Sequence, residues 1–247
     1  MSRKNKNNLI KYMLSLVVIF CLGLAGYFNL DFQPNNISAT NSNLIYENSF
    51  DFNTIPEFTS TPYVVLNNNE PNFNKNDFTT NSFESYSNLD SLGRCDIAFA
   101  NISIDTMPGA EEERENISSI KPSGWINKKY DIVDGGYLYN RCHLIGYQLS
   151  AENANEKNLI TGTRYMNTEG MLPFENKIAE YVKDSGNHVL YRVTPIYQGE
   201  NLVASGVQLE AKSVEDNGKG ICFNVYCYNV QPGITINYKT GDSKESV

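Results

Sequence analysis

YNRCHLIG, residues 139–146, is the stretch on which the interpretation of this chain depends. It places His143 two residues after a guanidinium and directly before a short apolar run. The chain has two histidines, and imidazole is the side chain whose ordinary pKa lies near neutral pH. His143 is therefore the main candidate for acid–base chemistry. The alternative is a histidine that only packs and forms hydrogen bonds.

Side chains with oxygen donors follow this stretch. Asn158 and Asn167 come after His143, and Glu175 lies eight residues beyond Asn167. Amide and carboxylate oxygens are the ligands that a hard divalent cation prefers. A single base beside an oxygen-rich metal site is typical of metal-assisted hydrolysis of a phosphodiester.

Hydrophobic patterns predict an α+β domain with an antiparallel sheet. Apolar residues at spacings of three and four predict a helix within residues 168–183, whose regular part begins at Pro173. We predict β segments at residues 63–66, 95–103, 137–145, 188–197, 202–212 and 221–230. The last three form an antiparallel meander. We expect residues 158–166 to be an irregular connection.

The N-terminal part of the chain has the composition of an export signal. A basic segment, residues 3–11, precedes an uncharged apolar run, residues 13–28. Residues 1–28 are therefore interpreted as a cleaved signal peptide or a retained membrane anchor, and the sequence leaves both open. Residues 29–53 are rich in Asn and are predicted to be a flexible linker. We expect a domain over residues 54–247, secreted or held on the outer face of a bacterial cell membrane.

The predicted domain is acidic. The chain holds 20 Lys and Arg and 28 Asp and Glu, of which residues 1–53 contain four and three, so 16 cations and 25 acids remain. This balance is unusual for a protein that neutralises many phosphates of a nucleic acid. Either no nucleic acid is bound, or a small basic site and a metal supply the positive charge. Residues 108–120, which are polar and acidic, are predicted to be a surface loop.

Cys95, Cys142, Cys222 and Cys227 are the cysteines of the predicted domain. Export would expose them to oxidising conditions, which allow one or two disulfides. The sequence does not select among the three pairings that four cysteines permit. No CxxC pair or Cys/His cluster indicates structural zinc.

Three segments, residues 139–149, 152–155 and 158–167, resemble the DNA/RNA non-specific endonucleases. The resemblance extends over about residues 55–243. More narrowly, the chain is similar to exported and surface nucleases of Gram-positive bacteria, including streptococcal secreted DNases and DNA-entry nucleases. The signature of this family, Asp-Arg-Gly-His, lies on a ββα metal finger that carries the active site. The resemblance therefore implies such a finger beside the antiparallel sheet.

The same resemblance implies a role for each candidate residue. His143 matches the general base, and Arg141 matches the arginine of the signature. Asn167 matches the asparagine that binds Mg²⁺, for which Mn²⁺ can substitute. Glu175 matches the glutamate that holds metal-bound water or supports the site. Asn158 matches an auxiliary asparagine near the scissile phosphate.

Two residues depart from the signature. Asn140 stands where the family has aspartate, so His143 lacks an adjacent carboxylate that would raise its pKa. Cys142 stands where the family has glycine, which is harmless if this position is an ordinary β residue. Arg141 and Arg164 are candidates for binding the phosphate of the substrate, with a surface salt bridge as the alternative for each.

These assignments imply an exported, Mg²⁺-dependent endonuclease that cuts DNA with little sequence preference and leaves 5′-phosphates. Cleavage of RNA is left open. Two other classes of function also stay open: a surface nucleic-acid-binding or DNA-uptake protein with weak or no catalysis, and a structural or adhesive exported domain. A membrane tether through residues 13–28 is a further option, and no feature of the sequence marks a protein partner.

Overall fold

The computed structural model describes residues 54–246. The predictions for residues 1–28 and 29–53 lie outside the described residues. Within residues 54–246, no helix is long and apolar enough to cross a membrane.

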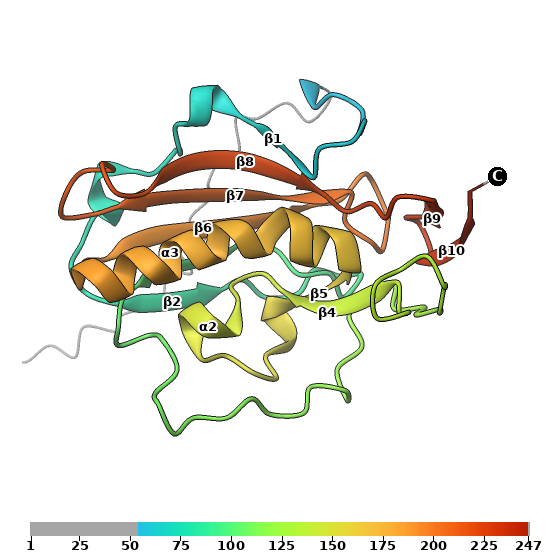
Figure 1. The fold of residues 1–247 in the computed structure, drawn as a ribbon, viewed down its shortest axis with the longest axis horizontal. Helices are drawn as coiled ribbons and strands as arrows, with labels where there is room; N and C mark the ends of the chain where they lie inside the picture. Colours follow the sequence, from blue (N-terminus) through green and yellow to red (C-terminus); the bar gives the residue numbers. More distant parts are fainter. Residues whose placement is uncertain (1–53, 247) are drawn as a thin grey trace, which may run out of the picture. The chain divides into compact units, whose positions relative to one another are not determined.

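A six-stranded antiparallel sheet forms the main layer of the fold (Figure 1). In spatial order its strands are β1 (Tyr63–Val65), β8 (Cys222–Tyr228), β7 (Gly206–Ser213), β6 (Val189–Ile196), β3 (Ala98–Ile102) and β2 (Phe83–Tyr86). The predicted meander corresponds to β6, β7 and β8, which pair consecutively. The predicted strands at residues 63–66 and 95–103 are also confirmed. β2 was not predicted, because it is short and only partly buried.

Helix α3 (Leu172–Ser185) lies across one face of this sheet (Figure 1). Its buried side chains pack on residues of the central strands in the main hydrophobic core. Proline is tolerated in the first turn, because an N–H at that position would have no partner within the helix. Gly186 ends the helix with a φ of 72°. The start at Leu172 agrees with the predicted start at Pro173. A π-helical segment, η5 (Met166–Met171), leads into it.

The opposite face of the sheet is covered by the segment after β1, which contains the 3-10 turns η2 (Asn67–Asn69) and η3 (Lys75–Asp77). Arg192 and Glu210 are cross-strand partners on β6 and β7 and form a buried ion pair of 2.7 Å. The backbone of Asn72 bonds to both side chains. Phe73 stacks on Phe99 with 5.8 Å between ring centroids. Both faces of the central strands are therefore buried.

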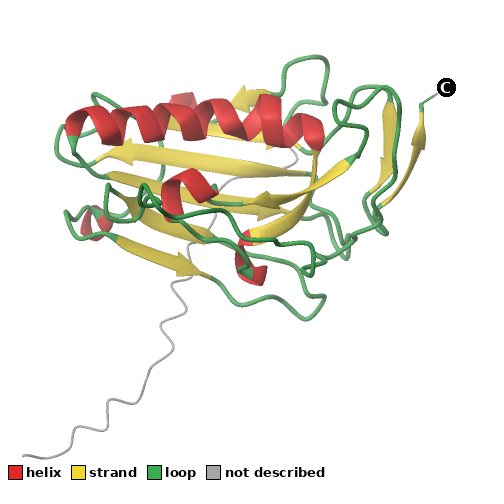
Figure 2. Ribbon diagram, turned by 60° about the horizontal axis from the view of Figure 1, so that its bottom comes forward, coloured by secondary structure: helices red, strands yellow, loops and turns green. Residues whose placement is uncertain are grey.

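A hairpin precedes α3 and forms a ββα unit with it (Figure 2). Its strands, β4 (Tyr139–His143) and β5 (Leu159–Thr163), are antiparallel, with His143 opposite Leu159. The short helices α2 (Tyr147–Ser150) and η4 (Glu156–Asn158) lie between them. The prediction that residues 158–166 form an irregular connection was wrong. Gly162 and its polar neighbours hide the strand in the sequence, and pairing with β4 forms it.

A smaller two-stranded sheet, β9 (Ile234–Asn237) and β10 (Asp242–Glu245), was not predicted. Ile234 packs with Val133, Leu138 and Tyr139 in a second hydrophobic cluster. This cluster supports the beginning of β4, the strand that ends at His143.

Candidate active site

Strand β4 presents different side chains on its two faces, because residues alternate across a strand. Arg141 and His143 lie on one face and contact the backbone of loops. Cys142 lies on the other face and contacts Asn167 and Met171 of η5. One short strand therefore connects the candidate base to the candidate metal ligands.

His143 is held by the loop that follows α2. Its Nε2 lies 3.0 Å from the main-chain oxygen of Asn153, so the tautomer protonated at Nε2 donates to this carbonyl and leaves Nδ1 as an acceptor. Burial lowers the pKa of His143; the Asn153 carbonyl opposes this effect, and the Arg114 guanidinium adds to it. The imidazole is therefore neutral at neutral pH, which is the state that a general base requires.

Glu175 is a buried carboxylate on α3, with 7% of its surface exposed. Its Oε1 accepts a hydrogen bond of 3.0 Å from the N–H of Gly146. Burial raises the pKa of Glu175 to about 7, and the Gly146 N–H and Arg114 oppose this effect. A Cβ at position 146 would lie 2.6 Å from Glu175 Oε2, so glycine is needed there for space.

Asn167 lies half-buried in η5, and its Oδ1 accepts a hydrogen bond of 3.0 Å from the thiol of Cys142. Cys142 is fully buried within β4, and its φ is not positive. The condition under which cysteine in place of glycine is harmless, an ordinary β conformation, is therefore met. Gly162 on β5 provides the room, since a Cβ there would lie 2.6 Å from the Cys142 Cβ.

Asn167 and Glu175 carry oxygen donors of the kind that suits a hard divalent cation. They lie on a continuous helical segment that changes from π to α, marked by the hydrogen bond from Leu172 N–H to the Asn167 carbonyl. Within residues 54–246, Glu175 forms no ion pair, so a cation would offset the cost of its burial. The same residues hold no group of three or more His, Cys, Asp and Glu side chains placed to bind a metal. One carboxylate and one amide oxygen suit Mg²⁺, which keeps several of its waters.

The amide of Asn158 is used inside the fold. Its Oδ1 accepts from the N–H of Ile145 at 2.9 Å, and its Nδ2 donates to the oxygen of Ile145 at 3.0 Å. Asn158 has no exposed surface. It therefore fixes the backbone two residues beyond His143, and its predicted position near the phosphate stays a prediction.

The guanidinium of Arg141 holds the preceding loop against β4. It donates to the oxygens of Ser118, at 2.7 Å, and of Ile120, and it lies 4.4 Å from the centre of the Trp125 ring. These contacts organise residues 118–125. The predicted contact of Arg141 with phosphate stays a prediction.

The structure does not bring Arg164 together with His143. Arg164 follows β5, five residues beyond the strand partner of His143, which places it roughly 16 Å away at ~3.3 Å per residue. Its guanidinium forms a 2.8 Å ion pair with Asp134, whose side chain is 82% exposed. This surface ion pair is the structural alternative to phosphate binding by Arg164. The contact of Arg164 with substrate stays a prediction.

Arg114 is a candidate site residue that the sequence interpretation missed. It lies in the predicted acidic loop, and its guanidinium is 5.0 Å from the centre of the Tyr147 ring. Its charge lowers the pKa of both His143 and Glu175. The sequence feature that could have indicated Arg114 is that it is the one cation among four glutamates in residues 111–115.

Two hydrogen bonds hold the loop around Arg114. The hydroxyl of Tyr147 donates to the oxygen of Glu112 at 3.2 Å. The N–H of Glu115 donates to Asn153 Oδ1 at 3.0 Å. The carbonyl of Asn153 also accepts a hydrogen bond from His143, so Asn153 holds both His143 and the loop that contains Arg114.

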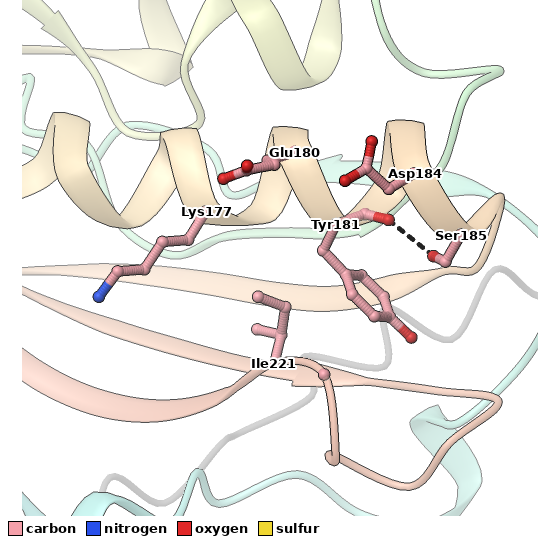
Figure 3. Close-up of a pocket in the computed structure, with 7 residues that line it drawn as sticks. Lys177, Glu180, Tyr181, Asp184, Ser185 and Ile221 are labelled. Atoms are coloured by element: carbon pink, nitrogen blue, oxygen red, sulfur yellow. Dashed lines mark hydrogen bonds between the residues drawn. The ribbon is translucent and has the colours of Figure 1, made fainter.

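The close-up in Figure 3 shows a pocket away from these residues, along the C-terminal half of α3. Its volume is about 430 Å³, and it is lined by Lys177, Glu180, Tyr181, Asp184, Ser185, Gly220 and Ile221. None of the candidate site residues lines it. The pocket is therefore separate from the candidate active site.

Comparison with known proteins identifies the group to which this arrangement belongs. Residues 72–215, which include every candidate site residue, match the model of the DNA/RNA non-specific endonucleases. The chain belongs to this family. The predicted family and fold class are thus confirmed, and the ββα unit of β4, β5 and α3 is the metal finger of an endonuclease-family domain.

Two solved structures are similar to this chain. NucA from Streptococcus agalactiae with magnesium ion bound has 28% sequence identity and a TM-score of 0.64, and the match covers 74% of this chain and 86% of NucA. Sda1 nuclease with bound zinc ion has 27% identity and a TM-score of 0.66, with 75% and 97% covered.

A curated relative is the deoxyribonuclease of Streptococcus dysgalactiae subsp. equisimilis. It is 32% identical over 119 residues, which are 46% of this chain. The match spans 34% of the length of that relative.

Proposed function

We propose that this chain is an exported, Mg²⁺-dependent endonuclease that hydrolyses phosphodiester bonds of DNA with little sequence preference. The observation that carries the proposal is the half-buried imidazole of His143, held at Nε2 by a carbonyl within the metal finger and kept neutral by a lowered pKa. The match to the nuclease family supports the reaction class. The magnesium and zinc ions in the structures of NucA and Sda1 support a divalent metal. The basic and apolar segments within residues 1–28 support export.

His143 performs the proton transfer in this proposal. Its Nδ1 takes a proton from water while the water oxygen forms a bond to phosphorus. The bond from phosphorus to the 3′-oxygen breaks, the 3′-oxygen takes a proton from solvent, and the phosphate remains on the 5′ side. His143 then returns its proton to solvent.

Asn167 and Glu175 would hold the divalent ion. The ion, when bound, supplies Lewis-acid stabilisation of the charge that develops on the phosphate. The Gly146 N–H keeps the Glu175 carboxylate in place, and the Cys142 thiol contacts the amide oxygen of Asn167.

Arg114 would provide the positive charge of the protein at the substrate. It is exposed, and it forms no ion pair with a carboxylate of the described chain, residues 54–246. A guanidinium presents paired N–H donors that match phosphate oxygens. Such a cation would let an acidic domain bind a polyanion with few phosphate contacts.

The test is cleavage of supercoiled plasmid by the purified protein in Mg²⁺, in excess EDTA, and with His143→Ala. We expect metal-dependent nicking and degradation, and a loss of roughly 10²- to 10⁴-fold in the variant. A folded wild-type protein that leaves plasmid intact in several metals and pH values would favour the nucleic-acid-binding alternative. Parallel reactions with RNA decide the range of substrates.

A further inference from the structure

The contact between Cys142 and Asn167 joins two rigid elements. Cys142 lies in the paired part of the hairpin, opposite Ile160 on β5, and its Sγ is 3.0 Å from Asn167 Oδ1. Met171 Sδ lies 3.5 Å from the same sulfur. Cys142 has no exposed surface in the folded structure. The position of the sulfur is thus fixed by the strand and by close packing.

The thiol acts as a donor in this contact. A thiolate requires a nearby positive charge or a metal, and a thiol buried among apolar groups stays protonated. The S–H group therefore donates to an oxygen, and the amide oxygen of Asn167 is the closest acceptor given by the structure. Such a hydrogen bond is weak in water. In the protein interior it is electrostatically stronger, because the local dielectric constant is lower.

This donor determines which end of the amide is presented. Asparagine has an oxygen with two lone pairs and an NH₂ group, and only the oxygen can bind a cation. An S–H donor that occupies one lone pair fixes the oxygen on the side of Cys142 and leaves the second lone pair for a ligand. Without this donor, rotation of the amide would place the NH₂ group toward the cation in part of the population.

The hairpin is built to accept this side chain. Gly162 lies on the facing strand, and a Cβ at that position would lie 2.6 Å from the Cys142 Cβ and 3.2 Å from its Sγ. Glycine on β5 thus provides the space that a cysteine occupies on β4. A glycine at position 142, as in the signature described above, would have no donor for Asn167.

From this geometry we propose that Cys142 is a positioning residue, whose thiol orients the amide of Asn167 for binding of the divalent ion. The inference rests on the proposed function, because Asn167 is there the metal ligand. It assigns a role to the departure from the family signature at position 142.

Binding of Mn²⁺ tests the inference without reference to activity. Free Mn²⁺ is measured by electron paramagnetic resonance while the full chain is titrated, for wild type, Cys142→Ala, Cys142→Ser and Asn167→Ala. We expect Asn167→Ala to abolish binding at the site and Cys142→Ala to weaken it roughly tenfold, the low end for loss of a group that supports a metal ligand. Cys142→Ser keeps a donor and should bind as wild type does.

Cys95→Ala is the matched control. Cys95 is also a buried thiol that donates to carbonyl oxygens, but its acceptors are Glu156 and Leu159. Its loss should leave Mn²⁺ affinity unchanged, and thermal melts show that each variant is folded.

Three results would overturn the inference. Equal affinity of Cys142→Ala and wild type, with binding lost in Asn167→Ala, rejects the role of Cys142 and leaves the proposed metal site intact. Unchanged binding by Asn167→Ala rejects the metal ligand itself, and the inference with it. If the alanine variant does not fold, a folded Cys142→Ser with tenfold weaker binding rejects hydrogen-bond donation.

Discussion

At Gly146, the lack of a side chain is what allows a carboxylate to reach the backbone. The φ of this residue is −59°, so its conformation does not require glycine. The requirement is steric, since both oxygens of Glu175 lie within 2.7 Å of the position that a Cβ would take. The candidate metal site therefore depends on a residue that contributes no chemical group of its own.

Gly146→Ala should displace Glu175 and impair the site. We expect overpacking to lower the free energy of unfolding by about 1–3 kcal/mol and activity to fall at least tenfold. Denaturant melts and plasmid cleavage measure the two effects. Gly109→Ala is the control, because nothing lies within 4 Å of its Cβ position and its φ is not positive. Equal behaviour of the two variants would contradict the steric argument.

Glu175 should make the metal-free protein less stable as pH rises. The folded carboxyl has a pKa of about 7 and the ordinary value is 4.5, so between these values the folded state holds a proton that the unfolded state has lost. The contribution of this group is fully present below about pH 4.5 and is lost by about pH 7, a difference of roughly 3 kcal/mol.

Melts in EDTA from pH 4.5 to 7.5 measure this dependence. Glu175→Gln keeps the size of the side chain and should flatten the curve, whereas Glu180→Gln, on the exposed side of α3, should retain it. A wild-type curve that does not fall relative to Glu175→Gln would exclude a buried carboxyl with a raised pKa.

On the scale of elements, the loop over residues 108–120 packs beside the metal finger and brings Arg114 to the candidate site. It is held by Tyr147 from α2, by Asn153 and by Arg141 from β4. None of these partners is close to the loop in the sequence. The position of Arg114 is therefore a consequence of packing between elements.

Arg114→Ala should lower kcat/KM roughly 10- to 100-fold, as expected for loss of a charge-assisted bond to phosphate. Because Arg114 lowers the pKa of His143, its removal should also move the acidic limb of the pH–rate profile to higher pH. Arg164→Ala is the matched control, since this arginine lies at the other end of the hairpin and pairs with Asp134. If Arg164→Ala lost more activity than Arg114→Ala, the phosphate would bind at the end of the hairpin near Arg164, and the role proposed for Arg114 would be rejected.

On the scale of the whole molecule, the sheet separates the candidate site from a buried ion pair. The face that carries α3 supports Glu175, and the opposite face contains the buried ion pair of Arg192 and Glu210. A change to this ion pair should affect stability and leave the geometry of the site intact, because the two lie on different faces.

Glu210→Ala should lower the free energy of unfolding by about 3–5 kcal/mol, because it leaves a buried guanidinium without its carboxylate. Below the melting temperature, kcat/KM should equal that of wild type. Asp134→Ala removes the carboxylate of an exposed ion pair and should change stability little. Urea melts and initial rates of cleavage give both quantities, and a loss of activity in folded Glu210→Ala would show that the two faces are coupled.

Local sequence patterns predicted the elements that bury a regular set of apolar side chains. The helical spacing in residues 168–183 and the alternation in residues 188–230 specify a face, and burial of that face forms α3 and the meander. β5 lacks such a pattern, because Gly162 and polar neighbours interrupt it. The strand forms only because β4 lies beside it.

The cysteines show the same division. Their number left one or two disulfides open, but the structure has all four as free thiols. The Cys142 thiol donates to Asn167, and the Cys95 thiol donates to the carbonyl oxygens of Glu156 and Leu159. Pairing requires proximity and orientation, which a count cannot supply.

The sequence by itself determined the family, the position of His143 on a strand, and the helix that carries Glu175. These follow from short motifs and from periodic burial, which are local properties. Only the tertiary structure decided that Arg114 lies by the base, that Arg164 does not, and that Asn158 is enclosed. The reason is physical: the partners of those three side chains come from segments that only chain folding brings together.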